Sequence, residues 1–330
     1  MKLSILELGR VREGSDRRGA LSDALALARH AEQLGFERFW VAEHHNMRGV
    51  STAATPVVIG HIAAGTQRIR VGAGGVMLPN HTPYIIAEQF GTLAELFPGR
   101  IDLGLGRAPG TDPMTLRALR RDPRSADRFP EDVRELQHYL EPARADQSIE
   151  AVPGSGTRVP LWILGSSLFG AELAAELGLP FGFASHFAPQ MLMDALGIYR
   201  SRFKPSRTLS EPYAMAGIGL IGADTGAEAR RLATTQQMSV TNLIRGERGL
   251  SQPPIDDIEG YWSPAERAHV MRMLSCSVVG DAEKLRAGIR QFAERTGVQE
   301  LMVVSDVFEP AARFRSLEII AESAQALRMA

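Results

Sequence analysis

The fold is indicated most clearly by residues 98–107, which read PGRIDLGLGR. Pro98 and Gly99 close a helical segment, and the short apolar run at residues 101–105 predicts a buried strand. Arg107 stands directly after this strand. The same succession of helix, short apolar strand and polar residue recurs along the chain, which favours parallel strands joined by crossover helices.

Eight strands are predicted in this way, at residues 3–8, 39–42, 69–76, 101–105, 161–164, 181–185, 214–221 and 301–305. The segments between them have helical spacing, and one predicted helix is capped by Asp281 and extends to Arg295. Eight alternating strands are the number expected of a barrel, whereas a doubly wound sheet usually has about five to seven. We therefore predict an α/β fold, a (β/α)8 TIM barrel, that forms a single domain over residues 1–330.

Two segments are too long and irregular to be ordinary connections. Residues 107–128, after the fourth strand, are rich in Arg, Asp and Pro and predict an inserted loop. Residues 246–264, after the seventh strand, contain three prolines and three glycines and predict a lid over the barrel mouth.

Composition excludes several classes of protein. Lys and Arg number 37 against 38 Asp and Glu, so no basic surface predicts a nucleic-acid partner. Cys276 is the single cysteine, which excludes an internal disulfide and any multi-cysteine metal centre. No apolar stretch approaches the roughly 18 residues that span a bilayer, so we expect a cytoplasmic protein without a membrane partner.

In a barrel of this class the chemistry lies at the carboxyl ends of the strands. Glu43, His44 and His45 follow the second strand, and adjacent residues on extended backbone point in opposite directions. At most one of the two histidines should therefore face the mouth. The alternative is a histidine at the strand end that forms only a structural hydrogen bond with a neighbouring loop. A metal site needs about three ligands, and no further spaced ligand set is evident at the strand ends, so no metal is predicted.

Three neighbouring strand ends suggest a cofactor. Gly74 and Gly75 leave room for a flat ring against the backbone, although glycines also simply make turns. Arg107 has the forked donor geometry that suits a phosphate. Residues 165–167 precede a helix, where unpaired N–H groups stabilise an anion, although Ser166 or Ser167 taken alone is more typical of a helix N-cap. Together these features predict a phosphorylated, flat cofactor.

Four longer stretches carry a resemblance to a known family: residues 42–46 (AEHHN), 72–79 (GAGGVMLP), 87–93 (AEQFGTL) and 98–110 (PGRIDLGLGRAPG). On these motifs the chain resembles the bacterial luciferase-like monooxygenases, and within them the flavin oxidoreductases rather than the light-emitting enzyme. The match is dense over residues 3–140, continues through residues 165–180 and becomes diffuse after residue 207.

The resemblance implies a TIM barrel that binds FMN, usually as reduced FMN from a separate flavin reductase, and uses O2 to oxygenate a small organic substrate. It also implies a homodimer. By position, His44 matches the family's active-site histidine, which handles protons beside the flavin, and Gly74 and Gly75 match a pair joined by a cis peptide bond. Gly106 replaces the reactive cysteine of the luciferase subunit, so luminescence is not expected. The cofactor-binding residues implied are Glu43, Gly74, Gly75, Arg107, Gly165, Ser166 and Ser167.

Three alternatives remain open at this level. Related barrels use coenzyme F420 for hydride transfer, the chain could bind flavin without catalysis, and a metal-dependent hydrolase shares the same barrel. The substrate cannot be read from the sequence. Its pocket is expected among the loops after the first, sixth and seventh strands, which include residues 8–10 and 185–187 and thus His186.

Overall fold

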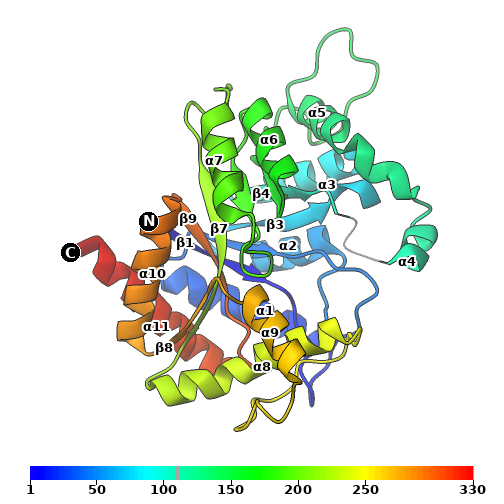
Figure 1. The fold of residues 1–330 in the computed structure, drawn as a ribbon. Helices are drawn as coiled ribbons and strands as arrows, with labels where there is room; N and C mark the ends of the chain where they lie inside the picture. Colours follow the sequence, from blue (N-terminus) through cyan, green and yellow to red (C-terminus); the bar gives the residue numbers. More distant parts are fainter. Residues whose placement is uncertain (109–111, 330) are drawn as a thin grey trace.

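A computed structural model describes residues 1–108 and 112–329 as a ring of parallel strands surrounded by helices (Figure 1). The strands are β1 (Lys2–Glu7), β2 (Arg38–Val41), β3 (Arg70–Met77), β4 (Ile101–Gly106), β5 (Leu161–Gly165), β6 (Phe181–Phe183), β7 (Ala214–Gly222), β8 (Ser277–Gly280) and β9 (Glu300–Val304). The α-helices are α1 (Arg17–Gln33), α2 (Thr55–Ala64), α3 (Pro83–Leu96), α4 (Pro113–Ala118), α5 (Phe129–Leu140), α6 (Leu168–Leu177), α7 (Leu192–Arg202), α8 (Gly226–Ile244), α9 (Pro264–Met273), α10 (Ala282–Thr296) and α11 (Pro310–Met329). Two 3-10 helices are η1 (Leu78–Asn80) and η2 (Pro123–Arg128).

The sheet closes on itself. Strands β1 to β7 pair in sequence, and β9 pairs with both β7 and β1, so eight parallel strands form a complete ring. These are the eight strands that the sequence predicts, and the (β/α)8 TIM barrel is confirmed. The N-cap prediction is also confirmed, because the Asp281 side chain accepts a hydrogen bond from the backbone of Lys284 at the start of α10.

The sequence analysis missed strand β8. It pairs only with the last residues of β7, from Gly219 to Gly222, and so lies outside the ring. With four residues and a single neighbouring strand, it has no long apolar run that would mark it in the sequence.

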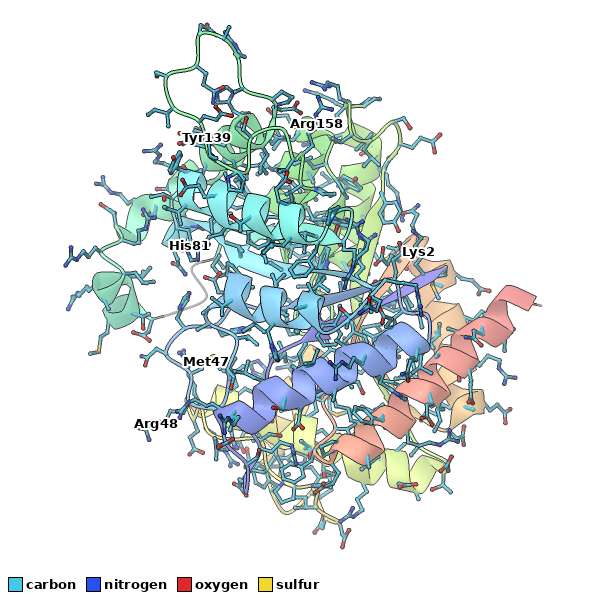
Figure 2. The ribbon with its side chains drawn as sticks, turned by 180° about the vertical axis from the view of Figure 1, so that it is seen from behind. Lys2, Met47, Arg48, His81, Tyr139 and Arg158 are labelled. Carbon is cyan, nitrogen blue, oxygen red and sulfur yellow. The ribbon has the colours of Figure 1, made fainter. Side chains whose placement is uncertain are left out.

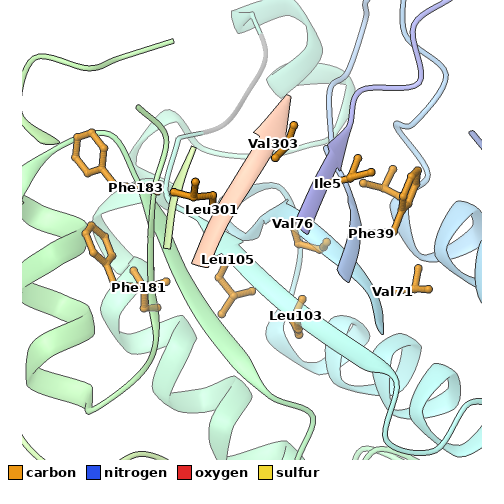
Figure 3. Packing of buried hydrophobic residues seen from close by; sticks show 14 of the residues in the cluster. Ile5, Phe39, Val71, Val76, Leu103, Leu105, Phe181, Phe183, Leu301 and Val303 are labelled. Atoms are coloured by element: carbon orange, nitrogen blue, oxygen red, sulfur yellow. The ribbon is translucent and has the colours of Figure 1, made fainter. Parts of the chain in front are cut away.

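The two faces of the barrel wall have different side chains because neighbouring residues of a strand point in opposite directions. Outward-facing residues pack under the helices in the main hydrophobic core, as Figure 3 shows for Phe39, Val71, Leu103, Leu301 and Val303. A separate cluster has the alternate residues of the same strands and fills the barrel interior: Leu6, Trp40, Ala42, Trp162, Met215, Met302 and Val304.

At the amino-terminal ends of the strands the interior holds a buried charge network. The Arg38 guanidinium lies 2.9 Å from Oδ2 of Asp102 and 2.8 Å from Oε1 of Glu300. Tyr213 donates to Oε2 of Glu300 at 2.8 Å, and Trp40 donates to Asp102 at 3.1 Å. Burial by itself would lower the pKa of Arg38, but the two carboxylates raise it above its ordinary value. The polar side chains at this end of the barrel are therefore paired with one another.

Of the two predicted irregular segments, the first contains more regular structure than expected and the second does not. Residues 107–128 include α4 and η2, in the described part of that segment. Residues 246–263 are irregular, and α9 begins at Pro264 with a capping box formed by Ser263 and Glu266. Among the described residues, every helix is too short or too polar to cross a lipid bilayer.

Candidate functional site

The carboxyl ends of the strands form the barrel mouth, and Figure 2 shows Lys2, at the start of β1, on the side of the molecule opposite His81 and Met47. Buried polar atoms without a hydrogen-bond partner, among the described residues, concentrate at this end. Five of them follow the ends of β1, β2, β6 and β9: Arg10 Nε, His44 Nδ1, His186 Nδ1, Ser305 Oγ and Asp306 Oδ2. Arg10 and Asp306 nevertheless form an ion pair, with 3.1 Å between Nε and Oδ2. Leaving such groups without hydrogen bonds costs free energy, so their concentration marks this end as a candidate binding site.

His44 lies just beyond β2. Trp40 and Ala42 belong to the interior cluster, and alternation of side chains carries His44 to the same side of the wall. Burial, which has the largest effect, and the positive charge of Arg10 together lower the pKa of His44 to about 4, against the opposing effect of Glu43. The imidazole is therefore neutral at pH 7, and its Nδ1 is unpaired.

Glu43 and His45, the neighbours of His44 in the sequence, belong to a separate hydrogen-bonded group that includes His81. The imidazole Nε2 atoms of His45 and His81 lie 2.7 and 2.8 Å from the same oxygen, Oε1 of Glu43. The backbone N–H of Met77 donates to Oε2 at 3.3 Å. Burial would raise the pKa of Glu43, but hydrogen bonds from the two histidines lower it to about 2. Glu43 is thus an ionised, buried group that ties the loop after β2 to the end of β3.

These three side chains also form a group that could hold a metal ion, since their ligand atoms all lie within 4.8 Å of one another. The sequence analysis found no such set, because His81 lies far along the chain and only the fold brings it to Glu43. In the structure the three groups satisfy one another by hydrogen bonds.

Gly74 and Gly75 are joined by a cis peptide bond, as the family resemblance implies. Both are held tightly in the wall. A Cβ atom on Gly74 would lie 2.6 Å from Cδ1 of Leu6, and one on Gly75 would lie 2.6 Å from the carbonyl oxygen of Gly104. Glycine is therefore required here by close packing of the strands.

Arg107 and the start of α6 come together. The Arg107 guanidinium carbon lies 4.2 Å from the centre of the Phe169 ring, in the first turn of α6. Arg107 is exposed, and the described residues offer it no acidic partner. Ser167 is the N-cap of α6, but its side chain makes no capping hydrogen bond. An unpaired guanidinium beside a helix N-terminus suits an anion.

Two further predicted positions, Gly165 and Ser166, lie next to the start of α6. Gly165 is the last residue of β5, so Ser166 lies between the strand end and the cap of α6. Residues 109 and 110 of the motif that contains Arg107 lie outside the described residues.

The predicted lid is anchored beside the mouth. Ser251 exchanges backbone hydrogen bonds with the loop after β1, donating to Val11 at 2.9 Å and accepting from Glu13 at 2.8 Å. The Tyr261 hydroxyl donates to Asn242 of α8 at 2.7 Å. Whether the segment closes over a ligand remains a prediction.

Comparison with known proteins agrees with the resemblance. The family model described as luciferase-like monooxygenase matches residues 1–300. A luciferase-like monooxygenase of Escherichia coli (strain K12) is 51% identical over 317 residues, covering 96% of this chain and 95% of the relative. The crystal structure of apo-MsnO8 is 34% identical, with a TM-score of 0.87 over 98% of both chains.

A more distant structure shares the fold. It is the oxygenating constituent of 3,6-diketocamphane monooxygenase from Pseudomonas putida in complex with FMN, 18% identical, with a TM-score of 0.73 over 98% of this chain and 97% of that one. The family match over nearly the whole chain decides the classification. This protein belongs to the luciferase-like monooxygenase family.

Proposed function

We propose that this luciferase-like monooxygenase uses reduced FMN and O2 to oxygenate a small organic substrate. The observation that carries the proposal is the position of Arg107, an exposed guanidinium without an acidic partner in the described residues, beside the N-terminus of α6. The FMN complex of the diketocamphane enzyme, which shares this fold, supports the choice of cofactor.

Arg107, Ser166 and Ser167 would hold the FMN phosphate. Arginine donates two parallel hydrogen bonds to a phosphate, and the free N–H groups of the helix N-terminus add further donors. The Ser167 hydroxyl is available for this role because it makes no capping hydrogen bond.

Bound reduced FMN supplies the two electrons with which one oxygen atom of O2 enters the substrate and the other leaves as water. In this proposal a separate reductase provides the reduced flavin. His44 would hold or release the proton that the reaction moves, at Nδ1, because that atom is unpaired and the ring is neutral. Neutral histidine is the form that can accept a proton at pH 7.

The first test is a pair of binding titrations of the purified protein, one with FMN and one with coenzyme F420, followed by flavin fluorescence. We expect FMN to bind and F420 to bind much more weakly. Preference for F420 would replace oxygenation by hydride transfer, the reaction of F420-dependent proteins with this fold such as a secondary alcohol dehydrogenase.

A second test separates binding from proton handling. The variant His44→Ala is expected to retain binding of reduced FMN and to lose substrate oxygenation. The role given to His44 is wrong if flavin affinity collapses while the bound complex turns over normally.

A further inference from the structure

His186, in the loop after β6, occupies an unusual place inside the barrel. Its Nδ1 atom lies 2.2 Å from the position that a Cβ atom on Gly217 would take. Gly217 is two residues beyond Met215, an interior residue of β7, and so faces the interior as well. The imidazole therefore fills the space where β7 lacks a side chain.

The neighbouring residue fixes this position. The Ser185 hydroxyl donates a 2.6 Å hydrogen bond to the carbonyl oxygen of Gly217, and both Ser185 and Gly217 are buried. The ring of His186 also makes an edge contact with the Phe187 ring, with 4.9 Å between the centroids. The loop after β6 is thus attached to β7 at the glycine that the imidazole covers.

The polar atom held in this way has no partner. His186 Nδ1 is buried and makes no hydrogen bond within the described residues. Burial lowers the pKa of His186 to about 4, with a smaller effect from the charge of His44. The ring is therefore neutral and can either donate or accept one hydrogen bond to a bound molecule.

His186 and His44 approach the mouth from opposite sides. In the ring of eight strands, β2 and β6 are separated by three strands in one direction and by three in the other. The charge of His44 also lowers the pKa of His186, to a smaller extent than burial does. Each ring leaves its Nδ1 unpaired.

We propose that His186 is a flavin-contacting residue, whose unpaired Nδ1 bonds a nitrogen or oxygen atom of the isoalloxazine ring, and that Gly217 is the residue that positions it. The proposal rests on the proposed function. A molecule with its phosphate at the ends of β4 and β5 and its ring beside His44 must cross the mouth, and β6 is the next strand after β5. Isoalloxazine carries carbonyl and N–H groups that complement a neutral imidazole.

The test uses oxidised FMN as the probe and the imidazole signals of the protein labelled with ¹³C and ¹⁵N at histidine. The chain has eight histidines, and spectra of the His186→Asn and His44→Asn variants assign the two that matter. We expect FMN to shift the His186 signal and to leave that of His138, on the exposed side of α5, unchanged. Binding itself is measured separately by quenching of FMN fluorescence.

Variants of the glycine test the positioning role. Gly217→Ala places a methyl group where the His186 ring lies, so we expect FMN to bind roughly 3- to 10-fold more weakly, as for His186→Ala, since one neutral hydrogen bond is lost. His186→Gln should restore part of the affinity. Gly197→Ala is the matched control, because a Cβ there meets no atom within 4 Å, and it should bind like the wild type.

The outcomes are distinguishable. If the wild-type protein binds neither oxidised nor reduced FMN, the proposed function fails and this inference fails with it. If FMN binds but the His186 signal does not move, or if His186→Ala binds as tightly as the wild type, only the inference about His186 is overturned. If Gly217→Ala does not fold, the signal shift and the two His186 variants still decide the outcome.

Discussion

The two ends of this barrel differ in how their polar groups are satisfied. At the amino-terminal end, the buried guanidinium of Arg38 is paired with two buried carboxylates, Asp102 and Glu300. At the mouth, His44 and His186 each leave a buried nitrogen unpaired, and Arg107 has no acidic partner among the described residues. The first end is arranged for stability and the second retains bonding capacity for a ligand, as expected when a TIM barrel separates the two tasks.

Removing a charged partner at the amino-terminal end of the barrel should give the largest change in the free energy of unfolding. Asp102→Ala removes the carboxylate that accepts from Arg38, Arg70 and Trp40, and leaves the buried Arg38 guanidinium with one buried carboxylate, Glu300, instead of two. We expect the free energy of unfolding, measured by denaturant titration, to fall by about 3–5 kcal/mol. The matched control is Asp256→Ala, which removes the exposed pair with Arg231 and should leave stability unchanged. Similar behaviour of the two variants would contradict the assignment of this end to stability.

Arg107→Met addresses the mouth and should leave the fold intact. Loss of a charged donor to phosphate is expected to weaken FMN binding roughly 10- to 100-fold, because hydrogen bonds to charged groups contribute about 1.5–3 kcal/mol. Fluorescence titration gives the affinity and thermal denaturation gives the stability. Arg144→Met, at an exposed arginine paired with Asp146, is the control. A large loss of stability with unchanged affinity would assign Arg107 to structure.

The mouth should also make stability depend on pH. The pKa values of His44 and His186 fall from 6.5 to about 4 in the folded protein, so the unfolded chain binds more protons between these values. The stability they contribute is complete above pH 6.5 and is lost as the pH falls toward 4, by up to about 1.4 kcal/mol per pH unit for each group. Denaturation curves at several pH values should show this slope, reduced in the His44→Asn, His186→Asn double variant. A slope retained in the double variant but lost in His138→Asn would refute the assignment.

Disturbing the contact that anchors the predicted lid should have the smallest effect of these changes, expressed as a free energy. A Cβ atom on Gly49 would lie 2.0 Å from the carbonyl oxygen of Gly249, so Gly49→Ala must push residues 246–264 away from the loop after β2. We expect a loss of about 1 kcal/mol in stability. We also expect more hydrogen peroxide per flavin oxidised, because a wetter site uncouples oxygenation. Gly249→Ala, at the other side of the same contact, meets no atom within 4 Å and is the control. Unchanged coupling in Gly49→Ala would weigh against a lid.

Local patterns in the sequence were sufficient for much of the barrel. Each of the eight ring strands is a short apolar run, and helix signals such as Asp281 lie within a few residues of the feature that they predict. Strand β8 was not predicted from the sequence because it is short and pairs with one neighbouring strand. Alternation alone predicts that His44 and His45 point in opposite directions, and in the structure His45 is paired with Glu43 whereas Nδ1 of His44 has no partner among the described residues.

Other features depended on contacts between residues far apart in the chain. His81 reaches Glu43 across 38 positions, and Glu300 reaches Arg38 across 262, so no local spacing could reveal either pairing. The same is true of the Arg107 contact with Phe169.

The sequence by itself determined the number of barrel strands, the end of each strand at which polar residues gather, and the family motifs. These are properties of short segments, because the direction of successive side chains repeats with a fixed period along a helix or a strand. Only the tertiary structure decided which polar groups form hydrogen bonds and which have no partner in the described residues, because closure of the strand ring brings distant strand ends together. The space above Gly217 that His186 fills exists only once β6 lies beside β7.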